Sequence, residues 1–181
     1  VGLVRFVMVH LYCCEAMISP LIRWPNLVCH YIAALTGICD EERKKQGVSF
    51  HKCHEQLFEW FSDPNIVWVS FHLQHDWNWL HYSFDSHGME LPKRIKGLCL
   101  SQVVAAGNQG IKKPLDKAMS DLINEARYEQ LQRKLPLQRH RALHDALIHR
   151  YLFGLLAKQA GGTAELVSKQ ALFTATSIDK V

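Results

Sequence analysis

The sequence predicts an α/β fold in which helices cover a central sheet. Two short apolar runs rich in β-branched residues, Leu3 to Val9 and Ile66 to Phe71, are typical of buried strands. Longer segments with apolar residues at helical spacing follow the second run. Because strands that alternate with helices pack as layers around one sheet, this order favours an α/β domain.

Length and composition favour one compact domain spanning residues 1–181. The chain has 181 residues, of which 48% are hydrophobic, and it carries a formal charge of +4. A chain of this size can bury a substantial core, and its apolar content is too high for a disordered protein.

Helices are predicted in order along the middle of the chain. The acidic and basic residues from Asp40 to Lys45 indicate a solvated helical turn, and a longer helix runs from Ser49 to Asp63. Its apolar positions are Phe50, Cys53, Leu57, Phe58 and Phe61. After the strand at Ile66 to Phe71, helical spacing returns from Asp76 to Phe84, through Trp77 and Leu80.

The second half of the chain is predicted to be mostly helical. A short extended stretch follows Gly88, and a helix covers Leu98 to Ala106. One helical segment is expected over Leu115 to Leu131 and a long one over Arg141 to Lys158. The long helix has apolar residues at four-residue steps, at Leu143, Leu147, Tyr151 and Leu155. Gly161-Gly162 should end it, and Thr163 can cap a final short helix.

Cysteine usage and hydropathy indicate the environment of the chain. All six cysteines lie in the first 99 residues and form no CxxC pair, which favours reduced thiols in the cytoplasm or another reducing compartment. Structural zinc is the alternative, at Cys29-His30 and Cys53-His54, although neighbouring side chains point apart and chelate one ion poorly. No apolar run approaches the roughly 18 residues of a membrane span, so no membrane partner is expected.

The excess positive charge is concentrated in one stretch of the chain. Between Lys112 and Arg141 there are eight basic and four acidic residues, which accounts for the whole net charge. The stretch is either an ordinary solvated helix face or a surface that binds phosphates.

A histidine and an aspartate follow this stretch at the start of the long helix. The string His140-Arg141-Ala142-Leu143-His144-Asp145-Ala146 resembles the third motif of the DnaQ-like (DEDDh) 3′→5′ exonucleases. Val69 to Leu80, with Asp76 at a helix start, resembles the second motif of that family. Leu35-Thr36-Gly37-Ile38 and Ala160 to Val167 are similar to further segments of the family, so the resemblance covers roughly residues 27 to 170.

The resemblance implies a fold, a reaction and a set of site residues. The fold would be ribonuclease H-like, with three layers and a central mixed sheet that is abbreviated near the N-terminus. The reaction would be hydrolysis of a single-stranded DNA or RNA from its 3′ end with Mg²⁺ or Mn²⁺, within a larger polymerase or repair complex. Asp76 and Asp145 would bind metal, and His140 would take the proton from the attacking water. The residues implied to bind substrate are Leu35, Thr36, Lys112, Lys113, Arg139 and Arg141. Without the resemblance, Asp76 could be a helix cap and His140 a surface histidine.

One departure from the family weakens the expected activity. The first motif of the family, Asp-x-Glu at the end of the first strand, is replaced by His10-Leu11-Tyr12. Glu15 is the only acidic residue before Asp40, so no shifted alignment restores the pair. Two hypotheses follow: a weakened exonuclease, or an inactive exonuclease-like module that binds nucleic acid or scaffolds a complex.

Overall fold

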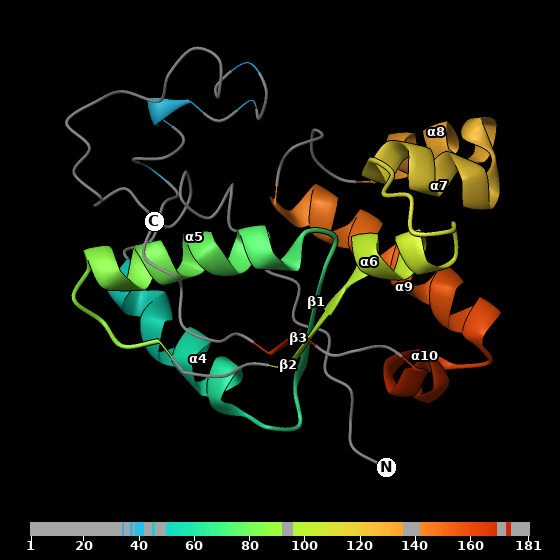
Figure 1. Cartoon of the computed structure of the whole chain (residues 1–181). Helices are drawn as coiled ribbons and strands as arrows, with labels where there is room; N and C mark the ends of the chain where they lie inside the picture. The colour runs from blue at the N-terminus through green and yellow to red at the C-terminus, as the bar shows by residue number, and fades with distance from the viewer. Residues whose placement is uncertain are drawn as a thin grey trace.

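The computed structural model describes residues 34, 37, 39–41, 45, 50–91, 96–135, 142–169 and 173–174. Helices predominate in this part of the chain, around a small sheet (Figure 1). The elements in chain order are α4 (Phe50–Ser62), β1 (Val67–Ser70), α5 (Leu73–Ser86), β2 (Lys96–Cys99), α6 (Leu100–Ala106), α7 (Leu115–Ile123), α8 (Glu125–Lys134), α9 (Ala142–Ala160), α10 (Thr163–Lys169) and β3 (Phe173–Thr174). The predicted α/β class is confirmed at this broad level, while the strand predicted at Leu3 to Val9 lies outside the described residues.

The sheet of the described residues has the order β1-β2-β3. β1 and β2 pair in parallel, from Val67 opposite Lys96 to Ser70 opposite Cys99, and β3 pairs antiparallel with β2. Because α5 connects the two parallel strands, the segment is a βαβ unit. All four residues of β1 are buried, as expected for a parallel strand that is covered on both faces.

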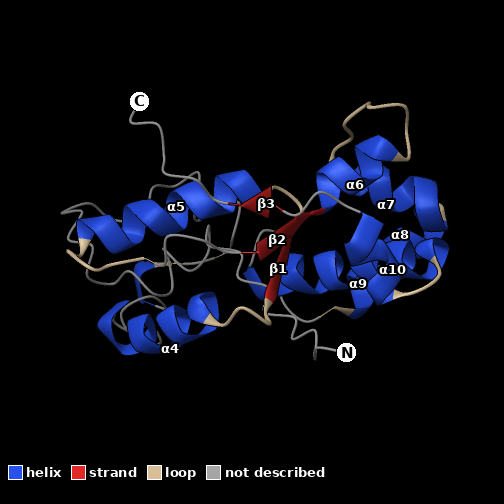
Figure 2. Cartoon of the chain, turned by 60° about the horizontal axis from the view of Figure 1, so that its bottom comes forward, coloured by secondary structure: helices blue, strands red, loops and turns tan. Residues whose placement is uncertain are grey.

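Two hydrophobic clusters lie on opposite faces of the sheet. Trp68 packs with α4 and α5, whereas its neighbours Val67 and Val69 pack with the C-terminal helices, as the alternation of side chains along a strand requires. Figure 2 shows α4 and α5 on one side of the strands and α6 to α10 on the other. The aromatic cluster contains Leu57, Phe61, Ile66, Trp68, Leu73, Trp77, Leu80, Phe84 and Cys99. The aliphatic cluster contains Val67, Val69, Phe71, Leu98, Leu100, Val103, Ala118, Met119, Tyr128, Ile148, Leu152, Phe153, Leu156, Ala157 and Leu166.

A glycine in β2 allows α5 to lie close to the sheet. A Cβ atom at Gly97 would overlap the end of the Leu73 side chain and would also contact the carbonyl oxygen of Trp68 at 3.5 Å. Leu73 is the first residue of α5, so this contact sets the start of the helix against the strand.

The predictions for α4, β1 and α5 are confirmed with small shifts of their ends. α4 ends at Ser62, just before the predicted stop, and β1 lies within the predicted run. α5 begins at Leu73 rather than at Asp76, because the carbonyl of His72 already accepts hydrogen bonds from the backbone N–H groups of His75 and Asp76. Trp77, an expected core position of α5, is buried.

The single helical segment predicted over Leu115 to Leu131 is wrong. The chain breaks at Asn124, which has a φ of 63°, and continues as a second helix. The Asn124 side chain accepts a hydrogen bond from the backbone N–H of Arg127 at 3.0 Å, so it caps α8. Asn124 combines this φ with a ψ of 159°, a conformation that few residues other than glycine adopt, and the side-chain cap helps to hold it.

The apolar stripe predicted for the long helix is not the face that it buries. Tyr151 is 42% exposed, whereas Ile148, Leu152 and Leu156 are buried. Apolar residues hold most positions of α9 and occur on all of its sides, so the sequence indicated a helix but not its orientation. Tertiary packing against the sheet selects the buried face.

The end of α9 and the start of α10 agree with the sequence-based prediction. α9 ends at Ala160, before Gly161 and Gly162, both of which have positive φ, and α10 begins at Thr163. In contrast, the helix predicted over Leu98 to Ala106 begins at Leu100, because the preceding residues pair in the sheet. Within the described ranges, no helix combines the length and hydropathy of a membrane span.

Candidate functional site

A pocket lies at the carboxyl end of β1, the position where open α/β sheets commonly bind ligands. Its volume is about 350 Å³, within the range of small-ligand sites. The end of β1, the first turn of α5, the start of α7, one face of α8 and the first turns of α9 all contribute to it. The lining residues are Ser70, Phe71, His72, His75, Asp76, Pro114, Leu115, Asp116, Tyr128, Gln132, His144, Asp145, Ile148 and His149.

Asp76 lines the pocket from the first turn of α5, and it is only 6% exposed. Its carboxylate accepts a hydrogen bond from the hydroxyl of Ser70, the last residue of β1. A buried carboxylate requires such a partner, and the N-terminal end of a helix also stabilises a negative charge. The cap position of α5 is occupied by His72, so Asp76 is a first-turn residue rather than the cap.

Asp145 reaches the same pocket from the first turn of α9, and its side chain is half-buried. The two carboxylates that the sequence singled out therefore lie on one cavity, although they are far apart in the chain. The connection is made by the packing of α9 and α5 near the end of the same strand.

Four histidines surround the carboxylates, a feature that sequence reasoning missed. His144 and His149 are buried, and His149 stacks on Phe71 with ring centroids 6.1 Å apart. His72 and His75 are exposed at the start of α5. A sequence signal did exist, because His149 is four residues after Asp145 and such pairs share a helix face.

The helices α7 and α8 form the opposite wall. The hydroxyl of Tyr128 on α8 donates a hydrogen bond to the carboxylate of Asp116 on α7 at 2.6 Å, and both residues line the pocket. The bond joins the first turn of α7 to the first turn of α8, which the break at Asn124 brings together. No sequence pattern indicated Asp116 or Tyr128, because their contact depends on that break.

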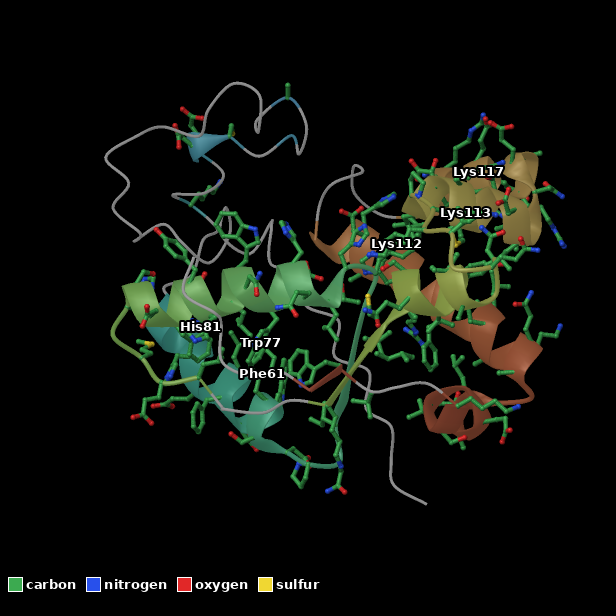
Figure 3. All side chains as sticks on the ribbon, in the orientation of Figure 1. Phe61, Trp77, His81, Lys112, Lys113 and Lys117 are labelled. Carbon is green, nitrogen blue, oxygen red and sulfur yellow. The ribbon has the colours of Figure 1, made fainter. Side chains whose placement is uncertain are left out.

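Lysines near the pocket differ in their surroundings (Figure 3). Lys112 is exposed on the segment that leads to α7. Lys113 and Lys117 both form ion pairs with Asp121, at 2.7 and 2.8 Å. Hydrogen bonds from Lys113 and Lys117 lower the pKa of the Asp121 carboxyl, and the hydrogen bond with Asp121 raises the pKa of Lys117. The basic stretch is thus partly neutralised by its own acidic residues.

Other residues singled out by the sequence lie outside the described residues. They are His10, Tyr12, Leu35, Thr36, Arg139, His140 and Arg141. Their roles remain predictions.

The resemblance in the sequence implied Mg²⁺ or Mn²⁺, which require oxygen ligands from side chains of the pocket. Within the described parts of the chain, no group of three or more His, Cys, Asp or Glu side chains is arranged to hold a metal ion. A single hydrated Mg²⁺ or Mn²⁺ is commonly held by one or two carboxylates together with a substrate phosphate, and Asp76 and Asp145 offer that number.

Comparisons with known proteins provide no relative for this chain. No protein-family model, curated protein or solved structure matches it.

Proposed function

We propose that the chain is a nucleic-acid-processing domain, similar to the 3′→5′ exonucleases, whose hydrolytic activity is weakened. The observation that carries the proposal is the placement of Asp76 and Asp145 on one pocket at the carboxyl end of β1. Only the resemblance singled out these two aspartates together, before their positions in space were considered.

The arrangement of the layers supports a ribonuclease H-like fold as part of this proposal. The described sheet is mixed, and helices lie on both of its faces. Asp76 follows a strand at the start of a helix, and Asp145 lies on the last long helix. These are the positions that the second and third motifs imply.

In this proposal the pocket binds the 3′ end of a single DNA or RNA strand. Asp76 and Asp145 would hold a divalent ion together with the last phosphodiester of the strand, and the ion would supply the polarisation of that group. His140 accepts the proton of the attacking water, a role that suits an imidazole near neutral pH. Lys112 contacts a phosphate further along the strand.

Hydrolysis is expected to be slow, because His10-Leu11-Tyr12 replaces two carboxylates of the expected metal site. With two aspartates as ligands, the charge of two divalent ions is poorly compensated. A polymerase or repair complex in a reducing compartment would supply the substrate.

A second candidate is an inactive module that binds nucleic acid or scaffolds a complex. The sequence favours it in one respect, since His10-Leu11-Tyr12 replaces the two carboxylates of the first motif. In this case the pocket retains a 3′ end without cleaving it.

A cleavage assay separates the two candidates. A 5′-labelled single strand is incubated with the protein and Mg²⁺ or Mn²⁺, and its shortening is followed with time. We expect slow shortening that Asp145→Asn and His140→Asn each reduce about a hundredfold or more. Shortening at an equal rate in Asp145→Asn would contradict the first candidate. Absence of shortening, with retained binding, would favour the second.

Salt-dependent binding tests the role of the lysines. We expect Lys112→Gln to lower the slope of log affinity against log salt by about one, as for a phosphate contact. Lys113→Gln should change it less, because Lys113 is already paired with Asp121. Lys158→Gln is the matched control, since it removes the same charge from the last turn of α9. An equal slope for all three variants would exclude a phosphate contact at Lys112.

A further inference from the structure

We propose that the outer face of α5 stacks the bases of a single strand whose 3′ end occupies the pocket. The inference rests on the proposed function, and it assigns a route for the strand beyond the pocket. Three side chains form the surface, which we call the aromatic stripe: His75, Trp79 and Tyr82.

The aromatic stripe follows from the helical repeat. Its members are spaced by four and three residues, so they lie on one side of α5. The buried residues Trp77, Leu80 and Phe84 lie on the opposite side, against α4 and the sheet. Burial of the second set therefore directs His75 and Tyr82 outward, and Tyr82 is 45% exposed, whereas Trp79 is half-buried and packs in part against the aromatic cluster.

Contacts within the stripe hold its rings in order. The indole N–H of Trp79 donates a hydrogen bond to Nε2 of His75 at 3.2 Å, and the two rings are nearly perpendicular. Trp79 and Tyr82 also meet edge to face, with centroids 6.0 Å apart.

Continuity with the pocket indicates what the stripe binds. His75 belongs to both, since it lines the pocket one residue before Asp76. The rise of an α-helix places Tyr82 about 10 Å further along, a length that spans about three stacked bases. A strand that leaves the pocket along α5 would pass over each ring in turn.

The charge of α5 favours bases over phosphates as the contacted groups. The helix has no lysine or arginine, and its two aspartates are Asp76 and Asp85. Such a face cannot attract a phosphate backbone, whereas aromatic rings stack on any base. The backbone would then face away from α5, toward solvent or toward basic groups such as Lys112.

Stacking is tested by binding of a labelled single strand of about ten nucleotides, with Ca²⁺ in place of Mg²⁺ so that a divalent ion is present while cleavage is suppressed. A matched strand lacks the bases at the second to fourth positions from the 3′ end but keeps its backbone. We expect the unmodified protein to bind the strand without these bases about fivefold or more weakly.

Variants locate the effect on α5. Tyr82→Ala should bind the complete strand about fivefold or more weakly than the unmodified protein does. For the strand that lacks the three bases, the variant and the unmodified protein should have nearly the same affinity. Tyr82→Phe should bind as the unmodified protein does, because it keeps the ring. Tyr151→Ala is the matched control, as it removes a tyrosine of similar exposure from α9, away from the pocket lining. Thermal unfolding of each variant verifies that it is folded.

The outcomes distinguish this inference from the proposed function. If no strand binds the unmodified protein, both are overturned. If the strand binds but Tyr82→Ala equals Tyr151→Ala, or if the missing bases have no effect, the stacking surface alone is overturned. A Tyr82→Ala variant that unfolds leaves the comparison of the two strands on the unmodified protein as the deciding result.

Discussion

The two faces of the sheet are packed with different chemistry. On one face, Phe61 stacks on Trp68 with centroids 3.8 Å apart and meets Trp77 edge to face (Figure 3). On the other face, leucine, isoleucine and valine side chains of α6 to α10 predominate. The pocket lies where the two layers meet at the end of β1, with Asp76 from the aromatic side and Asp145 from the aliphatic side.

The difference shows how the two layers serve one site. The aromatic cluster holds α5 through a few large rings, so the position of Asp76 depends on a small number of contacts. The aliphatic side builds most of the pocket wall from three separate helices. Its geometry therefore depends on how those helices pack together.

Removal of a large core side chain on each side gives the largest expected effect. Phe84→Ala should lower the free energy of unfolding by about 3–5 kcal/mol, and Leu152→Ala by about 2–5 kcal/mol. Both side chains are essentially buried, at 1% and 0% exposure. Denaturant unfolding measures the losses, and a loss below about 1 kcal/mol at either position would contradict the assigned core.

Replacement of the two aspartates compares the layers at the pocket itself. Asp76→Ala should cost about 1–3 kcal/mol of stability, because it leaves the buried Ser70 hydroxyl without its acceptor. Asp145→Ala should cost less, since that side chain is half-buried. Denaturant unfolding again provides the measurement. Equal losses at the two positions would show that the environments of the carboxylates do not differ.

The hydrogen bond between α7 and α8 tests the wall on the aliphatic side. Tyr128→Phe removes the donor to Asp116 while it keeps the ring in the core, and it should cost about 1 kcal/mol. Tyr151→Phe is the control, because Tyr151 is exposed on α9. If both substitutions leave the unfolding free energy unchanged, the bond does not stabilise the wall.

The ion pairs of Asp121 should have the smallest effect, because they are on the surface and are screened by salt. The folded pKa of Asp121 is lowered, so its stabilisation is present above the unfolded pKa and is lost as pH falls through the folded pKa. The folded pKa of Lys117 is raised, so its stabilisation is present below the ordinary value of 10.5 and is lost as pH rises through the folded pKa.

An NMR titration measures both groups. We expect the Asp121 carboxyl to titrate below the ordinary range, and Asp121→Asn to return the pKa of Lys117 toward its ordinary value. A Lys117 titration that does not change in Asp121→Asn would rule out the pair.

Local sequence was sufficient for much of the fold between α4 and α5. The spacing of Trp77, Leu80 and Phe84 indicated both the helix and its buried face. This succeeded because most other positions of α5 are polar, with Trp79 and Tyr82 as the large exceptions on the opposite side. The apolar run at β1 was equally clear, since both of its faces are covered.

For α9 and for the α7–α8 break, local sequence was insufficient. Apolar residues of α9 occur on all sides of the helix, so its sequence does not indicate which side is buried. Contacts with the sheet bury Ile148 and Leu152 rather than Leu147 and Tyr151. The break at Asn124 depends on a single residue with positive φ and an extended ψ, within a stretch that otherwise favours a continuous helix.

The residues of the pocket also fall into those that the sequence indicated and those that only the tertiary structure showed. The resemblance in the sequence singled out Asp76 and Asp145 together, since each lies in a segment similar to a motif of one family, and each lies in the first turn of a helix. Only the tertiary structure added the four histidines and the Asp116–Tyr128 bond to the same pocket. A motif records neighbours along the chain, whereas a pocket gathers side chains from strands and helices that approach one another only when the hydrophobic clusters pack.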